Sequence, residues 1–331
     1  EKKTEGKLKE YKINTTFINN LPFAKKLYQL YLPFMPLALE QIDLRDYDIV
    51  ISSESGPAKG VITGPNTLHF CYCHSPMRYA WDMYHDYMQK TNLVVKLLMK
   101  PVLHYIRLWD KLSSDRVDYF IANSKFVSKR IYKYYRRKST VINPPTDIDD
   151  FNLKKTSKEF YLVLGQLTHY KRADLVVDAF LKTDKKLVVI GDGEQLQTLK
   201  KRENSRIKIM GRQNWEICKK YLGEAKALIF PGVEDFGMVP VEANACGTPV
   251  ICFAQGGAKE TIVDKLTGVY FHEQSAEAII NAINYFEENY SDFNTVKIRS
   301  HACNFNKQRF EKEIKDFINT KYSDFIAKPN I

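Results

Sequence analysis

The chain has 331 residues, of which 44% are apolar and 27% charged, with a formal net charge of +11. This length suits two domains of ordinary size or one large α/β unit, and the composition is typical of a soluble globular protein. No apolar run approaches the roughly 18 residues that cross a bilayer, and the charged opening residues are unlike a secretory signal. The six cysteines favour buried, reduced thiols over a disulfide framework.

The first half of the chain mixes strands and helices. Short apolar runs predict strands over 47–52, 68–73 and 117–123. Ser124 is expected to cap a helix that runs to Tyr135. The tandem prolines of 141–147 cannot continue a helix or a central strand, so we expect a hinge between domains there.

The run 69–74 contains two cysteines and two histidines and so suggests a metal site. Alternation along a strand would place Cys71 and Cys73 on one face and His74 on the other. A single metal ion could not easily collect all of these side chains, and we expect no metal here.

Positive charge gathers between Lys90 and Lys138, which hold 13 Lys and Arg against 3 Asp and Glu. Aliphatic and aromatic residues from Leu97 to Trp109 can supply an apolar helical face in the same segment. A basic and apolar helix suits a peripheral contact with an anionic membrane surface, at roughly 1 kcal/mol for each well-placed cation. A solvated helical face is the equal alternative. Binding to nucleic acid is a weaker alternative, because no nucleic-acid-binding motif accompanies the charge.

Beyond the hinge, strands and helices alternate regularly. Strands are predicted over 160–164, 187–190, 207–210, 227–230, 249–253 and 268–271. Helical patterns fall between most of them, as at 172–182 and 216–224, and a last helix is predicted over 307–325. The alternation argues for a parallel sheet covered on both faces, as in Rossmann-like nucleotide-binding domains.

The segment 231–251 sets two carboxylates, Glu234 and Glu242, across a strand-to-helix junction. Glu234 follows a buried strand, at the edge where open α/β sheets bind ligands, and Glu242 lies on the helix. Between them, the N–H groups of Gly237 and Met238 can bind an anion at the positive end of the helix. The arrangement indicates a binder of a phosphorylated, sugar-like molecule.

This segment resembles the Glu-x7-Glu motif of the retaining GT-B glycosyltransferases of family 4, and most closely their bacterial mannosyltransferase-like branch. Three further blocks carry the resemblance in the family's order, namely 74–82, 165–172 and 256–262. The resemblance implies an α/β fold of two Rossmann-like domains that face each other across a cleft.

The resemblance also implies domain limits. We expect an acceptor-binding domain over 1–145, a donor-binding domain over 150–306, and a final helix over 307–325 that completes the first domain. Family members begin with a strand and a Gly-rich loop, whereas this chain opens with a charged segment. We therefore expect the N-terminal domain to lack that strand and loop, which would preserve donor binding and reduce turnover.

Each residue of the donor site has a role implied by the resemblance. The lysine that matches Lys171 contacts the diphosphate, and Arg172 is expected to assist, because the family often has an arginine where this chain has Gln166. Glu242 is expected to accept hydrogen bonds from the ribose, and Glu234 from the transferred sugar. The loop residues Phe236, Gly237 and Met238 complete the donor-binding set.

In the first domain, the family counterpart of His74 faces the donor sugar, so the catalytic candidates are His74, Lys171 and Glu234. The residues expected to line the acceptor side are Arg78, Trp81, Asp82 and Tyr84. No Asp-x-Asp pair has a metal-binding context, so we expect neither a metal nor another cofactor, with protein cations acting in their place.

The predicted function is retaining transfer of a hexose, mannose from GDP-mannose in particular, to a lipid-linked or cell-surface polysaccharide acceptor. UDP-sugars are the main alternative donors, because no loop sequence identifies the base of the nucleotide. A nicotinamide-dependent dehydrogenase is a weaker alternative, since Gly191-Asp-Gly193 lacks the full Gly-x-Gly-x-x-Gly spacing. A non-catalytic basic binding module would leave the two glutamates without a purpose. We expect a cytoplasmic enzyme that associates peripherally with the inner face of the plasma membrane.

Overall fold

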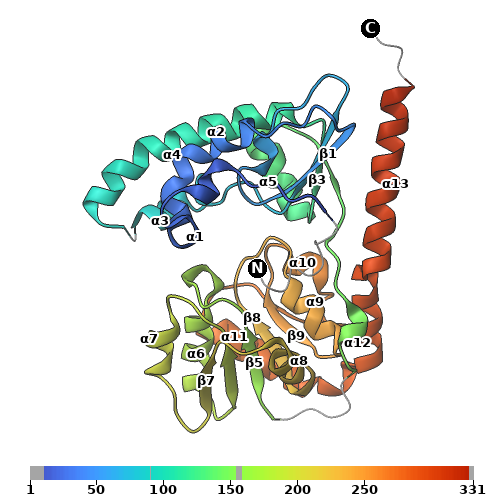
Figure 1. The fold of residues 1–331 in the computed structure, drawn as a ribbon. Helices are drawn as coiled ribbons and strands as arrows, with labels where there is room; N and C mark the ends of the chain where they lie inside the picture. Colours follow the sequence, from blue (N-terminus) through green and yellow to red (C-terminus); the bar gives the residue numbers. More distant parts are fainter. Residues whose placement is uncertain (1–10, 90, 154–158, 328–331) are drawn as a thin grey trace. The chain divides into compact units, whose positions relative to one another are not determined.

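A computed structural model of the chain describes residues 11–89, 91–153 and 159–327. These residues form two compact units, whose elements Figure 1 labels. Unit 1 takes in the chain up to Ala122, Val127–Thr140 and the segment from Lys321 onward. Unit 2 takes in Asn123–Phe126 and Val141–Thr320. The last helix therefore begins in unit 2 and ends in unit 1.

Unit 1 is built on a four-stranded sheet in the order β1-β2-β3-β4, with β1 at one edge. The strands are β1 (Ile49–Glu54), β2 (Leu68–Cys73), β3 (Tyr119–Ala122) and β4 (Ser139–Val141). β2 pairs in parallel with β1 and β3, and all its residues are buried, as expected for a parallel strand covered on both faces. The α-helices are α1 (Ala24–Leu27), α2 (Met35–Glu40), α3 (Tyr84–Gln89), α4 (Leu93–Ser113), most of α5 (Lys125–Tyr135) and the end of α13 (Lys307–Ile326).

Unit 2 contains a six-stranded parallel sheet in the order β10-β9-β8-β5-β6-β7. Its strands are β5 (Tyr161–Leu164), β6 (Leu187–Ile190), β7 (Ile207–Gly211), β8 (Ala227–Phe230), β9 (Val250–Phe253) and β10 (Gly268–Phe271). Its helices are α6 (Ala173–Leu181), α7 (Leu196–Lys200), α8 (Trp215–Glu224), α9 (Met238–Ala245), α10 (Ala258–Thr261), α11 (Ala276–Glu288) and α12 (Thr295–Ala302).

The strand order of unit 2 reverses between β5 and β8. From β5 the chain builds outward through β6 to β7, and from β8 it builds the opposite way through β9 to β10. Ligands of open α/β sheets bind outside the carboxyl ends of the strands at such a switch point. The loops that follow β5 and β8 are therefore where a ligand site is expected.

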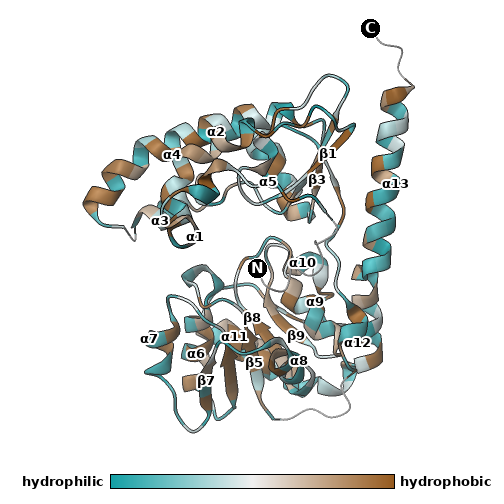
Figure 2. Cartoon of the chain, viewed as in Figure 1, coloured by the Kyte–Doolittle hydropathy of each residue, from teal (hydrophilic) through white to brown (hydrophobic). Residues whose placement is uncertain are grey.

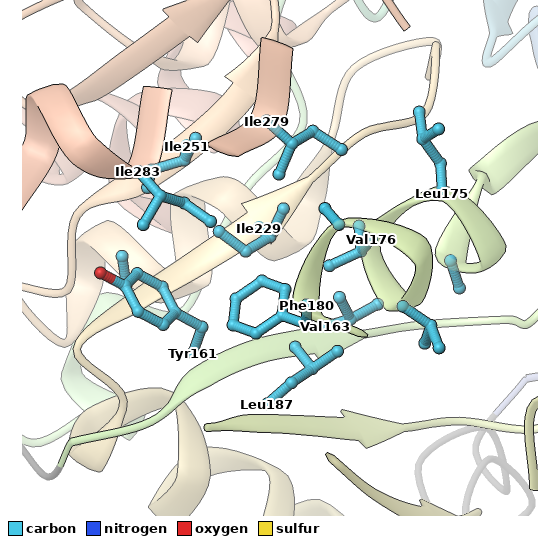
Figure 3. Packing of buried hydrophobic residues seen from close by; sticks show 14 of the residues in the cluster. Tyr161, Val163, Leu175, Val176, Phe180, Leu187, Ile229, Ile251, Ile279 and Ile283 are labelled. Atoms are coloured by element: carbon cyan, nitrogen blue, oxygen red, sulfur yellow. The ribbon is translucent and has the colours of Figure 1, made fainter. Parts of the chain in front are cut away.

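The core of unit 2 is apolar on both faces of the sheet. Figure 3 shows one cluster, in which Val163 of β5 and Ile229 of β8 meet Val176 and Phe180 of α6. A second cluster lies beneath α9 and includes Leu162 and Val241. Burial of this kind contributes roughly 25 cal/mol per Å² of apolar area, and it holds β5 and β8 in register beneath their loops.

The structure confirms the predicted strands of unit 2 within one residue at each end. In unit 1, β1 lies two residues later than predicted, and β4 was not expected because its Ser139-Thr-Val141 sequence is too short for an apolar run. The predicted helix over 307–325 is α13, and Lys321 near its end lies over the Tyr119 ring at 5.4 Å within unit 1.

α5 begins directly after Ser124 and ends at Tyr135, as predicted, and its first N–H groups have a distant acceptor. The hydroxyl of Ser124 donates to the backbone oxygen of Asp235 at 2.6 Å. The Glu260 carboxylate accepts from the N–H groups of Lys125 (2.8 Å) and Phe126 (3.0 Å), the first of the helix. An acidic group at a helix N-terminus stabilises it through the dipole, and this partner is 134 residues away or more, beyond the reach of local patterns.

All six cysteines are free thiols, five of them buried and Cys303 exposed. Within the described residues, no helix combines the length and apolar content that a membrane crossing requires.

Candidate functional site

The central pair of the site joins the two loops at the switch point of unit 2. Lys171 follows β5 at the end of a short 3-10 turn, η6 (His169–Lys171), and Glu234 follows β8. The Lys171 Nζ and Glu234 Oε1 atoms lie 2.6 Å apart, and both side chains are largely buried, with 23% and 20% exposed. β5 and β8 pair directly, so two residues distant in sequence become an ion pair.

The loop that carries Glu234 is held by a close backbone approach. The Gly257 N–H donates to the Glu234 backbone oxygen at 2.8 Å. A Cβ on Gly257 would lie 2.3–2.5 Å from backbone atoms of Phe236, so only glycine fits there. The 256–262 block therefore serves the site by fixing the position of the Glu234 loop.

The same loop leads into α9 through Gly237, whose φ of 91° favours glycine. The first N–H groups of an α-helix have no partner within the helix, and they form the positive end of its dipole. Met238 opens the helix and is 36% exposed. Phe236 is only 3% exposed and packs edge-on against Phe305 at 5.6 Å, so its ring belongs to the core.

Glu242 lies on α9, about one turn beyond the start of the helix. Burial raises the pKa of its carboxyl from 4.5 to about 7, because the charged form is poorly solvated there. Its charge also helps to raise the pKa of the Cys218 thiol, behind the larger effect of burial, which places the two side chains near each other. Cys218 lines the main cavity of the unit.

That cavity has a volume of about 630 Å³ and opens at the carboxyl ends of β5, β6 and β7. Its walls include Gln166, Asp192, Arg212 and Gln213. A smaller pocket, lined by Lys171 and Glu234 among others, shares Leu164, Gly165 and Gln166 with it. The volume of the larger cavity falls within the usual range for small-molecule sites, and the ion pair lines the smaller pocket beside it.

Arg172 has a left-handed backbone conformation, with φ of 55°, between η6 and α6. Its Nε atom lies 3.7 Å from a carboxylate oxygen of Asp174, in the first turn of α6. Its side chain is about one-third exposed and does not line either pocket, although Arg172 follows Lys171 in sequence.

In unit 1, His74 follows β2 at the carboxyl end of the sheet. Its backbone N–H donates to the oxygen of Glu54 at 2.7 Å, and its Nε2 is 2.9 Å from the Ser53 hydroxyl. The Tyr72 ring packs edge-on against its imidazole at 5.1 Å. These contacts orient the ring at the end of the strand.

The loop after His74 brings two of the predicted acceptor residues together. The Asp82 carboxylate lies 3.7 Å from Arg78 Nε and 2.8 Å from an Arg130 guanidinium nitrogen. Arg130 also lies 3.3 Å from the Ser75 hydroxyl. Arg130 was not predicted, because it comes from α5 and no local motif surrounds it.

Trp81 lies on the same loop, and Tyr84 is the first residue of α3. Trp81 stacks on Tyr134 of α5, with ring centroids 4.8 Å apart and planes 19° from parallel. Its indole N–H donates to Asp110 at 2.7 Å. Tyr84 lies beneath the Arg107 guanidinium at 4.8 Å.

A buried ionic network supports this loop from below. Lys59 is fully buried and pairs with Asp110 of α4 and with Glu54 of β1 at 3.3 Å. Asp110 also accepts from Tyr135 at 2.8 Å. Burial raises the pKa of the Glu54 carboxyl, although the neighbouring Lys59 ammonium opposes that shift. The sequence contained no signal for this network, since its members are far apart along the chain.

Across the described ranges, no group of three His, Cys, Asp or Glu side chains is arranged to hold a metal ion. Cys71 and Cys73 are buried in β2, and His74 lies beyond its end.

Two family models match the chain, one for each half. The model described as Glycosyltransferase Family 4 matches residues 3–150, and the model described as Glycosyl transferases group 1 matches residues 145–308. Together they account for most of the sequence.

Individual relatives agree with the family models. The chain is 25% identical over 292 residues to the alpha-1,3/1,6-mannosyltransferase ALG2 of Dictyostelium discoideum, covering 72% of this chain and 66% of that protein. It is 26% identical over 187 residues to an uncharacterized glycosyltransferase of Methanocaldococcus jannaschii, covering 54% of this chain and 53% of that protein. The chain thus spans between half and two thirds of the length of these two relatives.

Solved structures share the fold. Sucrose-phosphate synthase from Thermosynechococcus elongatus superposes with a TM-score of 0.72 at 18% identity, covering 91% of this chain and 80% of that one. Anabaena HepE in complex with UDP-glucose superposes with a TM-score of 0.64 at 17% identity, covering 93% and 84%. The chain therefore belongs to the group 1, family 4 glycosyltransferases, with the GT-B fold.

Proposed function

We propose that the chain is a retaining hexosyltransferase that moves mannose from GDP-mannose to a lipid-linked or cell-surface polysaccharide acceptor. The observation that carries the proposal is the ion pair between Lys171 and Glu234, which lines the small pocket beside the main cavity. It sets a cation suited to a diphosphate beside a carboxylate suited to sugar hydroxyls, at the switch point of a nucleotide-binding sheet.

The proposed donor pose follows from the charges of this site. The diphosphate lies against the Lys171 ammonium and the N-terminus of α9, which both favour an anion. The nucleoside occupies the main cavity, and its ribose hydroxyls donate to the Glu242 carboxylate. The diphosphate replaces Glu234 as the ionic partner of Lys171, so Glu234 becomes available to accept hydrogen bonds from the transferred hexose.

The proposed transfer step breaks the bond between the anomeric carbon and the diphosphate oxygen. A new bond forms from that carbon to an acceptor hydroxyl oxygen on the same face, and the hydroxyl proton passes to the departing diphosphate. Lys171 stabilises the negative charge that develops on the leaving group. One preorganised charged donor of this kind is worth roughly 3 kcal/mol of barrier.

On the acceptor side, we propose that His74 contacts the donor sugar and that Arg78, Trp81, Asp82 and Tyr84 contact the acceptor. Support comes from their place in the loop after β2 and at the start of α3, and from the contacts that orient the His74 ring. No metal or other cofactor has a role in the proposed chemistry.

Mannose is named as the sugar because a mannosyltransferase is similar to the chain over 72% of its length. The second candidate donor is a UDP-sugar, favoured by the fold shared with HepE in complex with UDP-glucose. Nothing among the comparisons supports the nicotinamide-dependent dehydrogenase. We further propose that the enzyme acts in the cytoplasm, attached peripherally to the inner face of the plasma membrane.

Thermal denaturation in the presence of GDP, UDP or NAD tests the donor class. GDP is expected to raise the melting temperature most, because binding only to the folded state stabilises it by mass action. A larger rise with UDP would select the alternative donor, and a rise with NAD alone would reject the proposed class. Assays of a nucleotide-sugar panel with membrane lipid extract then identify the sugar.

Two glutamate variants test the assigned roles. Glu242→Ala is expected to weaken nucleotide binding, because it removes the proposed ribose contact. Glu234→Ala is expected mainly to slow transfer, because it removes the proposed hexose contact. Calorimetric titration with GDP and initial transfer rates separate the two effects. Unchanged binding and unchanged rates in both variants would reject the site.

A further inference from the structure

One face of α4 is apolar and exposed along the whole helix. At about 100° per residue, Val95 lies apart, and the other seven large apolar side chains exposed on α4 fall within an arc of about 140°. Each is between 47% and 72% exposed, and together they form what we call the α4 stripe: Leu93, Val94, Leu97, Leu98, Tyr105, Leu108 and Leu112. Figure 2 shows apolar colours recurring along this helix between hydrophilic ones. Scattered apolar residues are normal at a surface, but a continuous strip of them marks an interaction site.

A separate face of the same helix holds it to unit 1. Leu103, Ile106 and Trp109 are buried there, and Ile106 and Trp109 pack with Met77 and Ala80. The α4 stripe is therefore additional to the face that the fold already uses.

The third face of the helix is basic. Lys96, Lys100 and Arg107 lie together beside the α4 stripe, at about 300–340° on the same helical projection. The one acidic residue of α4, Asp110, is buried and engaged by Lys59, Trp81 and Tyr135. The charges that α4 presents outward are thus all positive.

The start of the helix is well formed even though its residues are exposed. Asn92 caps it, its side-chain oxygen accepting from the Val95 N–H at 2.9 Å. The 21 residues give a length of about 30 Å. Figure 1 shows the first turns extending away from the strands of unit 1. A long amphipathic helix with a basic flank is the form that lies in the plane of a bilayer surface.

We propose that the α4 stripe inserts into the surface of an anionic bilayer, with Lys96 and Lys100 against the lipid phosphates. This deepens the membrane attachment proposed above by naming the surface, and it requires nothing of the donor site. Charge decides against a second copy of the chain on the same face, because paired stripes would bring like charges together. Anionic lipid instead complements the basic flank.

Vesicle flotation with the full chain tests the proposal. The protein is expected to float with phosphatidylcholine vesicles containing about 30 mol% phosphatidylglycerol, and far less with phosphatidylcholine alone. Leu97→Glu combined with Leu98→Glu is expected to reduce the bound fraction at least about tenfold. The matched control is Val296→Glu with Ile326→Glu, at positions 62% and 63% exposed outside α4, which is expected to bind lipid like the wild type.

The charge component is tested by Lys96→Gln combined with Lys100→Gln, which is expected to weaken binding to the anionic vesicles alone. If the variant with Leu97→Glu and Leu98→Glu floated with the anionic vesicles as well as the wild type does, the proposal would be overturned. A wild-type dimer in solution that fails to float and is dissociated by that variant would also overturn it. Titration with GDP is expected to be unchanged in all these variants. Loss of flotation and loss of nucleotide binding are therefore scored separately.

Discussion

Units 1 and 2 place their candidate functional residues on different kinds of support. In unit 2, Lys171 and Glu234 rest on a sheet whose buried clusters are apolar. In unit 1, the loop of His74 and Trp81 rests on the buried ions around Lys59. Apolar packing tolerates changes that conserve volume. Removing one partner of a buried ion pair instead leaves an uncompensated charge and strongly destabilises the fold. The two candidate half-sites should therefore respond differently to substitutions beneath them.

The largest expected effect comes from Lys59→Met. It leaves the Glu54 and Asp110 carboxylates buried without their cation, which should destabilise unit 1 by about 3–5 kcal/mol. Urea denaturation followed by fluorescence measures the change. Lys129→Met on exposed α5 surface is the matched control and should cost little. Restored stability in the variant that also carries Glu54→Gln and Asp110→Asn would assign the loss to uncompensated charge. If Lys59→Met alone were as stable as the wild type, the predicted destabilisation of unit 1 would be contradicted.

The next effect concerns chemistry in unit 2. Lys171→Met removes the proposed cation for the leaving diphosphate, and transfer should slow about 10²–10³-fold, equivalent to about 3–4 kcal/mol. Initial rates at saturating donor check this. Lys182→Met, at an exposed position, should leave the rate unchanged. The Lys171 variant should lose less stability than the Lys59 variant, because the Glu234 side chain is 20% exposed whereas Glu54 and Asp110 are buried.

Glu242 should make the stability of unit 2 depend on pH. Its folded-state pKa, about 7, exceeds the ordinary 4.5, so the folded state binds the proton more tightly. Stability should then fall as pH rises from 4.5 to 7, by up to about 3 kcal/mol. Glu242→Gln should match the wild type near pH 4 and exceed it at pH 8. Urea titrations at both pH values decide the point, and parallel pH profiles would contradict the assignment.

The smallest expected effect refines the comparison within unit 1. Trp81→Phe keeps an aromatic ring on Tyr134 but removes the indole hydrogen bond to Asp110, at a cost of about 1–2 kcal/mol. Trp215→Phe in unit 2 loses a longer bond, 3.3 Å, to the exposed Asp150 and should cost less. Chemical denaturation of both variants tests this order, and equal losses would show that burial of Asp110 is unimportant.

Most of unit 2 could be predicted from the sequence because its signals are local. Each strand is an apolar run between turn residues, and Gly247, with φ of 74°, follows the end of α9. Loops after strands and the starts of helices locate the candidate ligand residues without knowledge of the sheet order. The ion pair of Lys171 and Glu234 was different, since it required the adjacency of β5 and β8.

Unit 1 was less predictable because its key contacts are long-range. Glu54, Lys59 and Asp110 have no shared periodicity, and Arg130 reaches Asp82 from a separate helix. A lysine between Ala58 and Gly60 is ordinarily solvated, and only the folded chain shows it buried. The basic and apolar character of α4 was visible in the sequence, but its division into three faces required knowing which face packs on the unit.

A crystal structure of the chain soaked with GDP-mannose tests the central assignment most directly. The account predicts the diphosphate within hydrogen-bond distance of Lys171 and the first N–H groups of α9. It also predicts the ribose on Glu242 and the mannose on Glu234. A nucleotide-sugar bound away from the carboxyl ends of β5 and β8, with the Lys171–Glu234 ion pair intact, would contradict it.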